Sequence, residues 1–244
     1  MPEIKLRRPK LYFIKFRELI AFIANPKDNI SSDLSLKEKL KEIVVFYIIK
    51  LFISTFLILI IELLFKINND AAQSFSQNHH PLIVLLLGAF LAPLVEEAMF
   101  RLSIIFKPIF LAVSIGLFTL TILSRIEDVG ILKFNETTYY RYGLGLVTSV
   151  LAFYFSKKYQ LVIKHFWQKN FRWIYYFSAI TFGFFHFSNF DLVPSSFLLI
   201  PILTLPHTTG GLFFGYIRIK HGFIYALSFH CLNNMISLSL SLLL

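Results

Sequence analysis

Seven long blocks of apolar residues restrict the fold of this chain more than any other feature. They cover residues 43–65, 81–95, 104–123, 142–155, 173–187, 195–217 and 223–244. A membrane-spanning helix needs about 20 apolar residues, with a range near 17–25, and neighbouring residues can extend the shorter blocks. Only 16% of the 244 residues are charged, whereas soluble domains have about 25%. We therefore predict an all-α protein, a polytopic transmembrane helix bundle of seven to eight spans.

Positive charge is concentrated in segments that border the apolar blocks. Residues 1–41 contain ten Lys or Arg, and residues 157–172 contain five and no acidic residue. Because basic loops stay in the cytoplasm, the net charge of +10 indicates topology and attraction to anionic lipid, not nucleic-acid binding. We predict an integral protein of the cell (inner) membrane with a cytoplasmic N-terminus. The segments 66–80 and 125–141 are then outside, and no oligomeric state is indicated.

The charge pattern divides the chain into two regions. Residues 1–41 form a basic cytoplasmic amphipathic segment, in which residues 9–24 mix apolar and basic side chains. This mixture is typical of a helix that lies in the membrane interface, and Pro26 ends it. Residues 42–244 form the transmembrane helical domain.

The block at 195–217 is the least regular of the seven. It is interrupted by Pro201, Pro206 and the pair Gly210-Gly211, which weaken a helix. It can therefore be one span or two helices. Two helices would give an eighth span and would place the C-terminus in the cytoplasm.

Adjacent carboxylates, Glu96 and Glu97, lie with Arg101 at the end of an apolar block. A charge at the bilayer centre costs at least about 2.5 kcal/mol, so such residues indicate a functional site. Three pairs of residues at a spacing of four lie in different apolar blocks: Glu97 and Arg101, Phe182 and His186, His230 and Asn234. Each spacing places both members on one helix face.

Each pair taken alone also has a structural interpretation. His186 can be a hydrogen-bonded core histidine, and His230 with Asn234 can link helices by hydrogen bonds. Glu97 and Arg101 can be a structural ion pair. Together, however, the pairs supply carboxylates, histidines and an amide, which form an acid-base set with hydrogen-bond donors.

In this order, Glu-Glu-x-x-x-Arg, Phe-x-x-x-His and His-x-x-x-Asn resemble the three motifs of the CPBP intramembrane proteases. That family includes the type II CAAX prenyl endopeptidases and the bacterial Abi proteins. Residues 210–216, with His221-Gly222 before His230, are similar to the run into the family's last motif. The resemblance covers about residues 81–237. It implies an endopeptidase that uses glutamate-activated water to hydrolyse a peptide bond of a membrane-associated or lipidated protein.

The resemblance also implies the role of each site residue. Glu96 would be the general base, and His186 would help to orient the attacking water. His230 and Asn234 would stabilise the oxyanion, with each donor worth roughly 3 kcal/mol. Three further residues would hold these catalytic residues in position without contacting the substrate: Glu97, Arg101 and Phe182.

The helix geometry is consistent with a division of labour between the two glutamates. Glu97 shares a face with Arg101 and should stay ionised beside it. Glu96 points about 100° away, so it can be the desolvated base that the reaction requires.

A zinc site is the alternative chemistry for the same residues. Its ligands would be Glu96, Glu97, His186 and His230, since zinc binds His and carboxylate. The sequence lacks His-Glu-x-x-His, the helical zinc-protease signature, and Asn234 is a poor zinc ligand. We therefore expect that no cofactor is required.

The separation of the motifs departs from the family pattern, in which the second motif follows the first closely. Here 85 positions separate Arg101 from His186, and they contain two apparent spans. Two inserted spans preserve the direction of the helices after them, so the motifs can still converge. When the spans are followed in order from a cytoplasmic N-terminus, however, Glu96 falls toward the inner side of the membrane and His186 toward the outer side. Convergence therefore requires that the His186 helix is broken or re-entrant, or that helix ends differ from the apolar blocks.

Two other functions are compatible with the sequence. The chain can be a non-enzymatic immunity or scaffold protein of the same fold, or a proton-coupled transporter that uses Glu96 or Glu97. The substrate and its prenylation are not readable from the residues. Of the remaining polar residues, Lys50 is expected to snorkel from a span end, and His207 is a candidate to line the cavity.

Overall fold

The computed structural model describes residues 8–28, 30, 33–65, 80–190 and 194–243. These described residues form helices joined by turns, with no strand among them, which confirms the predicted all-α class. Apart from His80, the predicted outer loop at 66–80 lies outside the described residues.

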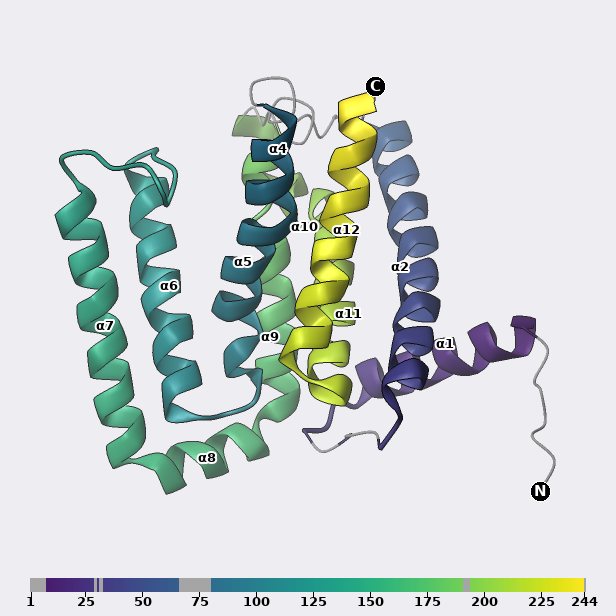
Figure 1. The fold of residues 1–244 in the computed structure, drawn as a ribbon, viewed down its shortest axis with the longest axis horizontal. Helices are drawn as coiled ribbons and strands as arrows, with labels where there is room; N and C mark the ends of the chain where they lie inside the picture. The colour runs from purple at the N-terminus through teal and green to yellow at the C-terminus, as the bar shows by residue number, and fades with distance from the viewer. Residues whose placement is uncertain (1–7, 29, 31–32, 66–79, 191–193, 244) are drawn as a thin grey trace.

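The helices run side by side, except for α1 and α8, which lie across one end (Figure 1). In chain order the elements are α1 (Arg8–Ala24), α2 (Leu36–Phe65), α4 (Pro81–Ile83), the π-helix η1 (Val84–Leu91), α5 (Ala92–Phe100), η2 (Leu102–Ile104), α6 (Pro108–Ile126), α7 (Thr138–Lys158), α8 (Gln160–Lys169), α9 (Phe171–Phe184), η3 (Phe187–Asn189), η4 (Pro194–Leu199), α10 (Ile200–Leu203), α11 (Leu205–His221) and α12 (Phe223–Leu243).

Local sequence signals explain where several helices begin and end. Ser35 and Glu38 form a capping box at the start of α2, since the backbone N–H of Ser35 donates to the Glu38 carboxylate over 2.9 Å. Pro81 and Pro108 occupy first helical positions, where the missing N–H is not needed. Helix α11 ends before Gly222, whose φ of 105° suits glycine.

Four helices in the described part of the chain are long and apolar enough to span a membrane. They are Leu36–Phe65, Pro81–Ile104, Pro108–Ile126 and Phe223–Leu242, and a bent pair, Phe197–Leu203 with Leu205–His221, would make a fifth. These spans establish an integral membrane protein, but they are fewer than the seven or eight predicted. Helix α7 is rich in Tyr, Ser, Thr and Gly, and α9 has only 14 residues, below the usual minimum of about 17.

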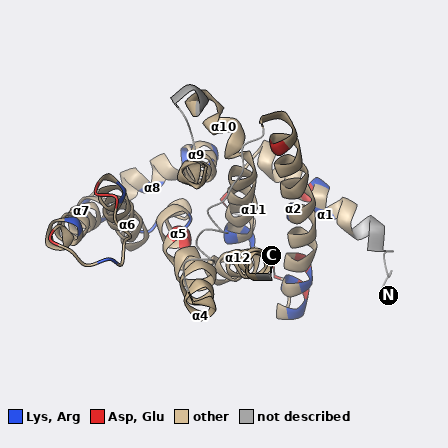
Figure 2. Ribbon diagram, turned by 90° about the horizontal axis from the view of Figure 1, so that it is seen from above, with Lys and Arg blue, Asp and Glu red and all other residues tan. Residues whose placement is uncertain are grey.

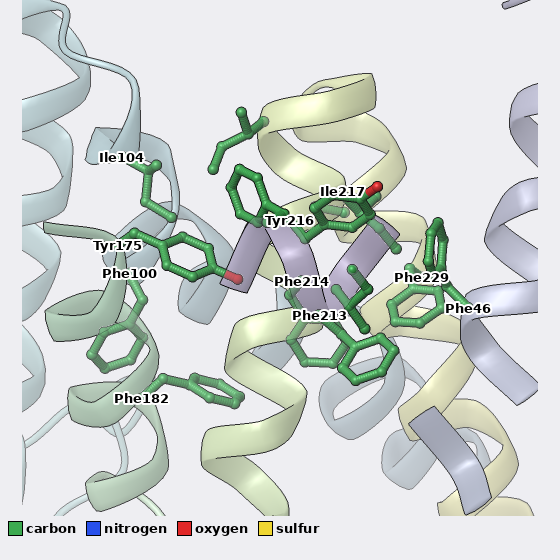
Figure 3. Close-up of a cluster of buried hydrophobic side chains, with 14 of the residues drawn as sticks. Phe46, Phe100, Ile104, Tyr175, Phe182, Phe213, Phe214, Tyr216, Ile217 and Phe229 are labelled. Atoms are coloured by element: carbon green, nitrogen blue, oxygen red, sulfur yellow. The ribbon is translucent and has the colours of Figure 1, made fainter. Parts of the chain in front are cut away.

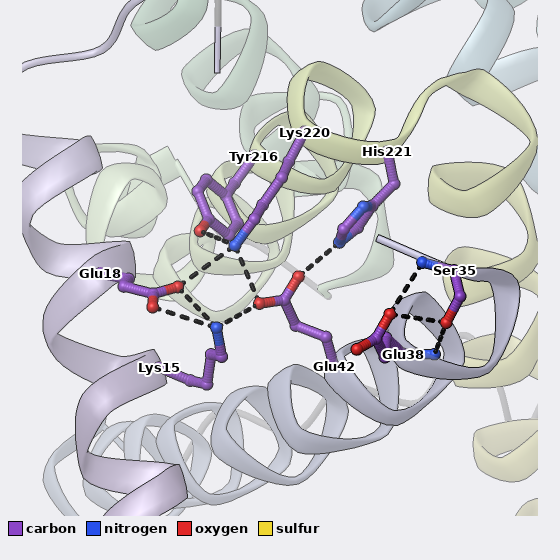
Figure 4. A network of polar contacts seen from close by, with 8 residues as sticks. All are labelled: Lys15, Glu18, Ser35, Glu38, Glu42, Tyr216, Lys220 and His221. Atoms are coloured by element: carbon purple, nitrogen blue, oxygen red, sulfur yellow. Dashed lines mark hydrogen bonds and ion pairs between the residues drawn. The ribbon is translucent and has the colours of Figure 1, made fainter. Parts of the chain in front are cut away.

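A buried polar network attaches α1 to α2 and α11 (Figure 4). The Glu42 carboxylate lies 2.6 Å from the ammonium of Lys15, 2.9 Å from that of Lys220 and 2.7 Å from His221 Nε2. Glu18 of α1 adds a second carboxylate, 3.2 Å from Lys220. Because α1 also places Leu19 and Phe22 in the main core, it is packed against the bundle rather than separate from it.

The core is an aromatic cluster in which α2, α5, α9, α11 and α12 meet (Figure 3). Its labelled members are Phe46, Phe100, Ile104, Tyr175, Phe182, Phe213, Phe214, Tyr216, Ile217 and Phe229. The pair α6–α7 stands to one side of these helices (Figure 2). The two helices between the first and second motifs therefore form a lateral hairpin, and the helices that carry the motifs pack directly on one another.

Small residues bring α9 and α11 into close backbone contact. A Cβ atom added to Gly211 would lie 3.0 Å from the Cα of Ala179, and one added to Gly183 would lie 2.9 Å from the backbone nitrogen of Thr208. Such contacts are typical of helix pairs in membranes, where small side chains permit close approach.

The irregular block at 195–217 is broken as the sequence suggests, but at one point only. The chain bends by 42° between Leu203 and Leu205, just before Pro206. Gly210 and Gly211 lie inside α11 and do not interrupt it. A glycine keeps its backbone N–H, so the helix continues through it, and its missing side chain leaves room for a neighbouring helix to approach closely.

Candidate active site

Glu97 and Arg101 form a fully buried ion pair at the end of α5. Both side chains are 0% exposed, and Glu97 Oε1 lies 3.3 Å from Arg101 Nη1. The guanidinium carbon also lies 3.7 Å from the centroid of the Phe182 ring of α9. The cation is thus held between a carboxylate and an aromatic face, which attracts it electrostatically.

His230 of α12 lies between the two glutamates. Its Nδ1 is 2.9 Å from Glu97 Oε1, and its Nε2 is 3.6 Å from Glu96 Oε2. Its ring stacks on Phe214, with centroids 4.3 Å apart. The Glu96 side chain is 25% exposed whereas that of Glu97 is 0% exposed, so Glu96 is the glutamate that a substrate or water molecule can reach.

His186 follows the C-terminal end of α9 and is held by two contacts. Its Nδ1 lies 2.8 Å from the carbonyl oxygen of Phe182. Because a carbonyl only accepts, Nδ1 is the donor, and a neutral ring then presents Nε2 as an acceptor. The ring also stacks on His207 of α11, with centroids 4.1 Å and planes 12° apart.

Helix α9 is short and ends before it reaches His186. Fourteen residues span about 21 Å, less than the hydrocarbon thickness of about 30 Å. Helix α9 ends at Phe184, and a 3₁₀ turn from Phe187 comes next. Of the alternatives that the sequence left open, the structure shows a different helix end: α9 stops three residues before the apolar block does, and His186 lies in the turn that follows.

Asn234 is oriented by a carbonyl group that the π-helix exposes. Its Nδ2 donates to the Gly88 carbonyl over 3.0 Å, and its Oδ1 accepts from Asn233 over 3.3 Å. A π-helix is rare and often marks a functional site, because its wider turn frees backbone groups. One of the two N–H donors of Asn234 is used in this bond, and the second is available to a ligand.

A cavity of about 350 Å³ is lined by Glu96, His186, His230 and Asn234 together. The structure therefore brings the four predicted catalytic residues to one space, from η1–α5, the end of α9 and α12. A second cavity of about 580 Å³, mainly apolar, lies between η1–α5 and α6. Glu96, His186 and Asn189 line both cavities, so the candidate base stands where a polar space meets an apolar one.

The polar cavity also contains residues that the sequence pattern marks less clearly. Lys50, Asn189, His207 and Asn233 line it. The expectation that Lys50 snorkels to the membrane surface is wrong: the residue is 9% exposed, and it donates to Asn233 of α12. Its position inside an apolar block was the available signal, because charges in such blocks usually face a bundle interior.

The predicted zinc ligands do not form a metal cluster. Within the described residues, no group of three or more His, Cys, Asp or Glu side chains could hold a metal ion. His186 faces His207 and the Phe182 carbonyl, whereas His230 lies between the two glutamates.

The apolar helices enclose one cavity lined by Glu96, His186, His230 and Asn234, the acid-base and hydrogen-bonding groups expected of a membrane protease. The family model described as type II CAAX prenyl endopeptidase Rce1-like matches residues 78–236, and the chain belongs to this family. The match includes all three motifs and confirms the family resemblance. No curated protein and no solved structure matches the chain.

Proposed function

We propose that the protein is an intramembrane endopeptidase that cleaves prenylated proteins near their carboxyl end with water activated by Glu96. One observation carries the proposal: Glu96, His186, His230 and Asn234 line a single cavity. The family to which the chain belongs, the type II CAAX prenyl endopeptidases, supports the class of substrate.

In the proposed reaction, Glu96 takes a proton from water while the water oxygen attacks the carbonyl carbon of the scissile bond. The proton then passes to the leaving nitrogen as the C–N bond breaks. Glu96 suits this role because it lies at the cavity wall, 3.6 Å from His230. His186 presents Nε2 as an acceptor and can orient the second hydrogen of the water.

The oxyanion would be stabilised from α12. Asn234 has an N–H donor that is not used by Gly88. Because His230 Nδ1 already donates to Glu97, His230 Nε2 donates only in the imidazolium form, which carries a proton on both ring nitrogens. Such donors act strongly because they are fixed before the charge develops. His230 is fixed by Glu97 and by stacking on Phe214.

Glu97, Arg101 and Phe182 would hold the catalytic residues in place. The Phe182 ring contributes twice, because it faces Arg101 and also lies edge-on to the His186 ring, with centroids 4.7 Å apart. These two ring contacts give a physical reason for a Phe four residues before the His, whereas any residue would supply the carbonyl group that bonds His186.

We propose that no metal takes part and that the apolar cavity of about 580 Å³ receives the prenyl group. Glu96, His186 and Asn189 line this cavity as well as the polar one. A substrate with its lipid there would present its peptide to the base.

We further propose that α7 also crosses the membrane, and that α9 crosses it together with the turn and η3 that follow. With the four apolar helices and the bent pair, this gives seven spans. The basic segments would then share the cytoplasmic side with the N-terminus. The transverse helices α1 and α8, at the same end of the bundle (Figure 1), would lie in the inner interface.

The test of the mechanism is Glu96→Gln, which keeps the side-chain shape but removes the base. We expect turnover of a prenylated CAAX peptide by the purified protein, with a chelator present throughout, to fall by about 10²–10⁴-fold. Glu127→Gln, at an exposed carboxylate, is the matched control and should retain wild-type turnover. Full activity of the Glu96 variant would refute the mechanism, and loss of wild-type activity with the chelator would refute the absence of a metal.

A further inference from the structure

Helix α2 points two buried polar side chains toward the cavity system, and neither is needed for the reaction proposed above. Lys50 and Ser54 are four residues apart, so they lie on one face of the helix. They are 9% and 5% exposed. A lysine and a serine at this depth require an explanation, because buried polar groups are normally paired.

Their pairing is incomplete. The ammonium group of Lys50 donates to the side-chain oxygen of Asn233, and no described Asp or Glu forms an ion pair with it. The hydroxyl oxygen of Ser54 is buried without a hydrogen-bond partner among the described residues. One helix face therefore presents a cation without a counter-charge and an unused hydroxyl donor.

These groups lie at the junction of two cavities. Lys50, His207 and Asn233 line both the catalytic cavity and a neighbouring cavity of about 400 Å³. Ser54 lines the neighbouring cavity. The acidic residue of that cavity, Glu62, is about three helical turns further along α2, roughly 18 Å from Lys50 along the axis.

A hydrogen-bonded chain connects this junction to the catalytic residues. Lys50 bonds Asn233, Asn233 bonds Asn234, and Asn234 bonds the Gly88 carbonyl. Since Asn233 and Asn234 are adjacent on α12, a group bound at Lys50 lies close to the proposed oxyanion site. Each residue of an extended peptide spans about 3.3–3.6 Å, so a few residues bridge the two positions.

We propose that Lys50 and Ser54, with Asn233, bind the free C-terminal carboxylate of the substrate. This inference rests on the proposed function, because CAAX sequences stand at the C-terminus of a protein. The carboxylate supplies the missing counter-charge for Lys50 and an acceptor for Ser54, and both bonds are charge-assisted. The subsite would select chains whose carboxyl end lies a fixed distance beyond the scissile bond.

The test compares two forms of one prenylated CAAX peptide, with a C-terminal carboxylate or a C-terminal amide. The wild-type protein should hydrolyse the acid with a kcat/KM about 30-fold or more above that of the amide. Lys50→Met should reduce this ratio to a few-fold, and Ser54→Ala should reduce it by about tenfold. Lys41→Met, at an exposed lysine of the same helix, should leave the ratio at the wild-type value.

A binding measurement separates this inference from the proposed mechanism. The Glu96→Gln protein should bind the fluorescent acid peptide about 30-fold or more tightly than the amide, and adding Lys50→Met should remove the difference. Equal binding of acid and amide by the Glu96→Gln protein would overturn the carboxylate site even if Glu96 is the base. A clear acid preference with full turnover in the Glu96 variant would instead overturn the mechanism and leave the site intact. The comparison of peptides in the wild-type protein needs no variant, so misfolding of Lys50→Met cannot hide the result.

Discussion

Gly183→Ala should damage both the stability and the activity of the protein, because it separates α9 from α11. The new Cβ would lie 1.9 Å from the hydroxyl of Thr208 and 2.9 Å from the Cβ and backbone nitrogen of Thr208. Rotation of the Thr208 side chain relieves the first contact but not the other two. Since carbon contacts need about 3.5–4.0 Å, the two helices must part by about 0.6–1 Å.

The energetic consequence depends on two opposing effects. Overpacking of this kind costs about 1–3 kcal/mol, and the better helix propensity of alanine returns at most about 1 kcal/mol. We expect a net loss of about 1–2 kcal/mol, which lowers Tm by roughly 2–8 °C for a chain of this size. The same shift separates His186 from His207, which stack across this contact, so turnover should fall by up to about 10²-fold.

The measurement is thermal unfolding in detergent, together with peptide turnover below the transition. Gly143→Ala is the matched control, because nothing lies within 4 Å of its new Cβ and α7 should gain about 0.5–1 kcal/mol. If Gly183→Ala unfolds at the wild-type temperature with wild-type turnover, the α9–α11 contact does not position the site, and the reasoning fails.

The remaining predictions concern the end of the bundle where α1 and α8 lie (Figure 1). Glu42→Gln should cost about 3 kcal/mol, because it removes the buried carboxylate that Lys15, Lys220 and His221 share; an unchanged Tm would contradict this. Burial lowers the pKa of Lys15, but hydrogen bonds to Glu42 and Glu18 outweigh burial and raise the pKa above the usual 10.5. The stability that the charged Lys15 contributes should therefore persist from about pH 6 to 9. It should be lost only as the pH rises through the raised pKa. In a Cys231→Ser background, Lys164→Cys on α8 should react with an impermeant thiol reagent only from the cytoplasmic side; labelling from outside would reverse the proposed orientation.

Much of the site was readable from the sequence because its residues contrast with their surroundings. Charged and amide side chains are rare in apolar blocks, so Glu96, Glu97, His230 and Asn234 were recognisable without coordinates. The spacing of four predicts a shared face, and Glu97 and Arg101 do meet across one helical turn. The break at 195–217 was also visible, since proline interrupts a helix through its own geometry.

Other features depend on contacts between helices, which spacing does not encode. The convergence of the motifs requires a break or a different helix end near His186, but the apolar block at 173–187 does not show that α9 ends after 14 residues and leaves His186 in a turn. Lys50 resembled a snorkelling lysine because its nearest polar partner, Asn233, is 183 positions away in the chain. The π-helix that offers the Gly88 carbonyl to Asn234 has no signature in the residues Val84–Leu91.

The sequence by itself predicted a helical membrane protein, because hydrophobic length acts locally, and its motifs marked both the resemblance to the CAAX protease family and the candidate catalytic residues. Only the tertiary structure decided the position of His186 in a turn, the position of Lys50 at the junction of two cavities and the exposure of Glu96 rather than Glu97. These depend on how closely α9, α11 and α12 approach one another. That approach is set by the volumes of glycine and aromatic side chains facing each other across the bundle, not by the order in which they occur.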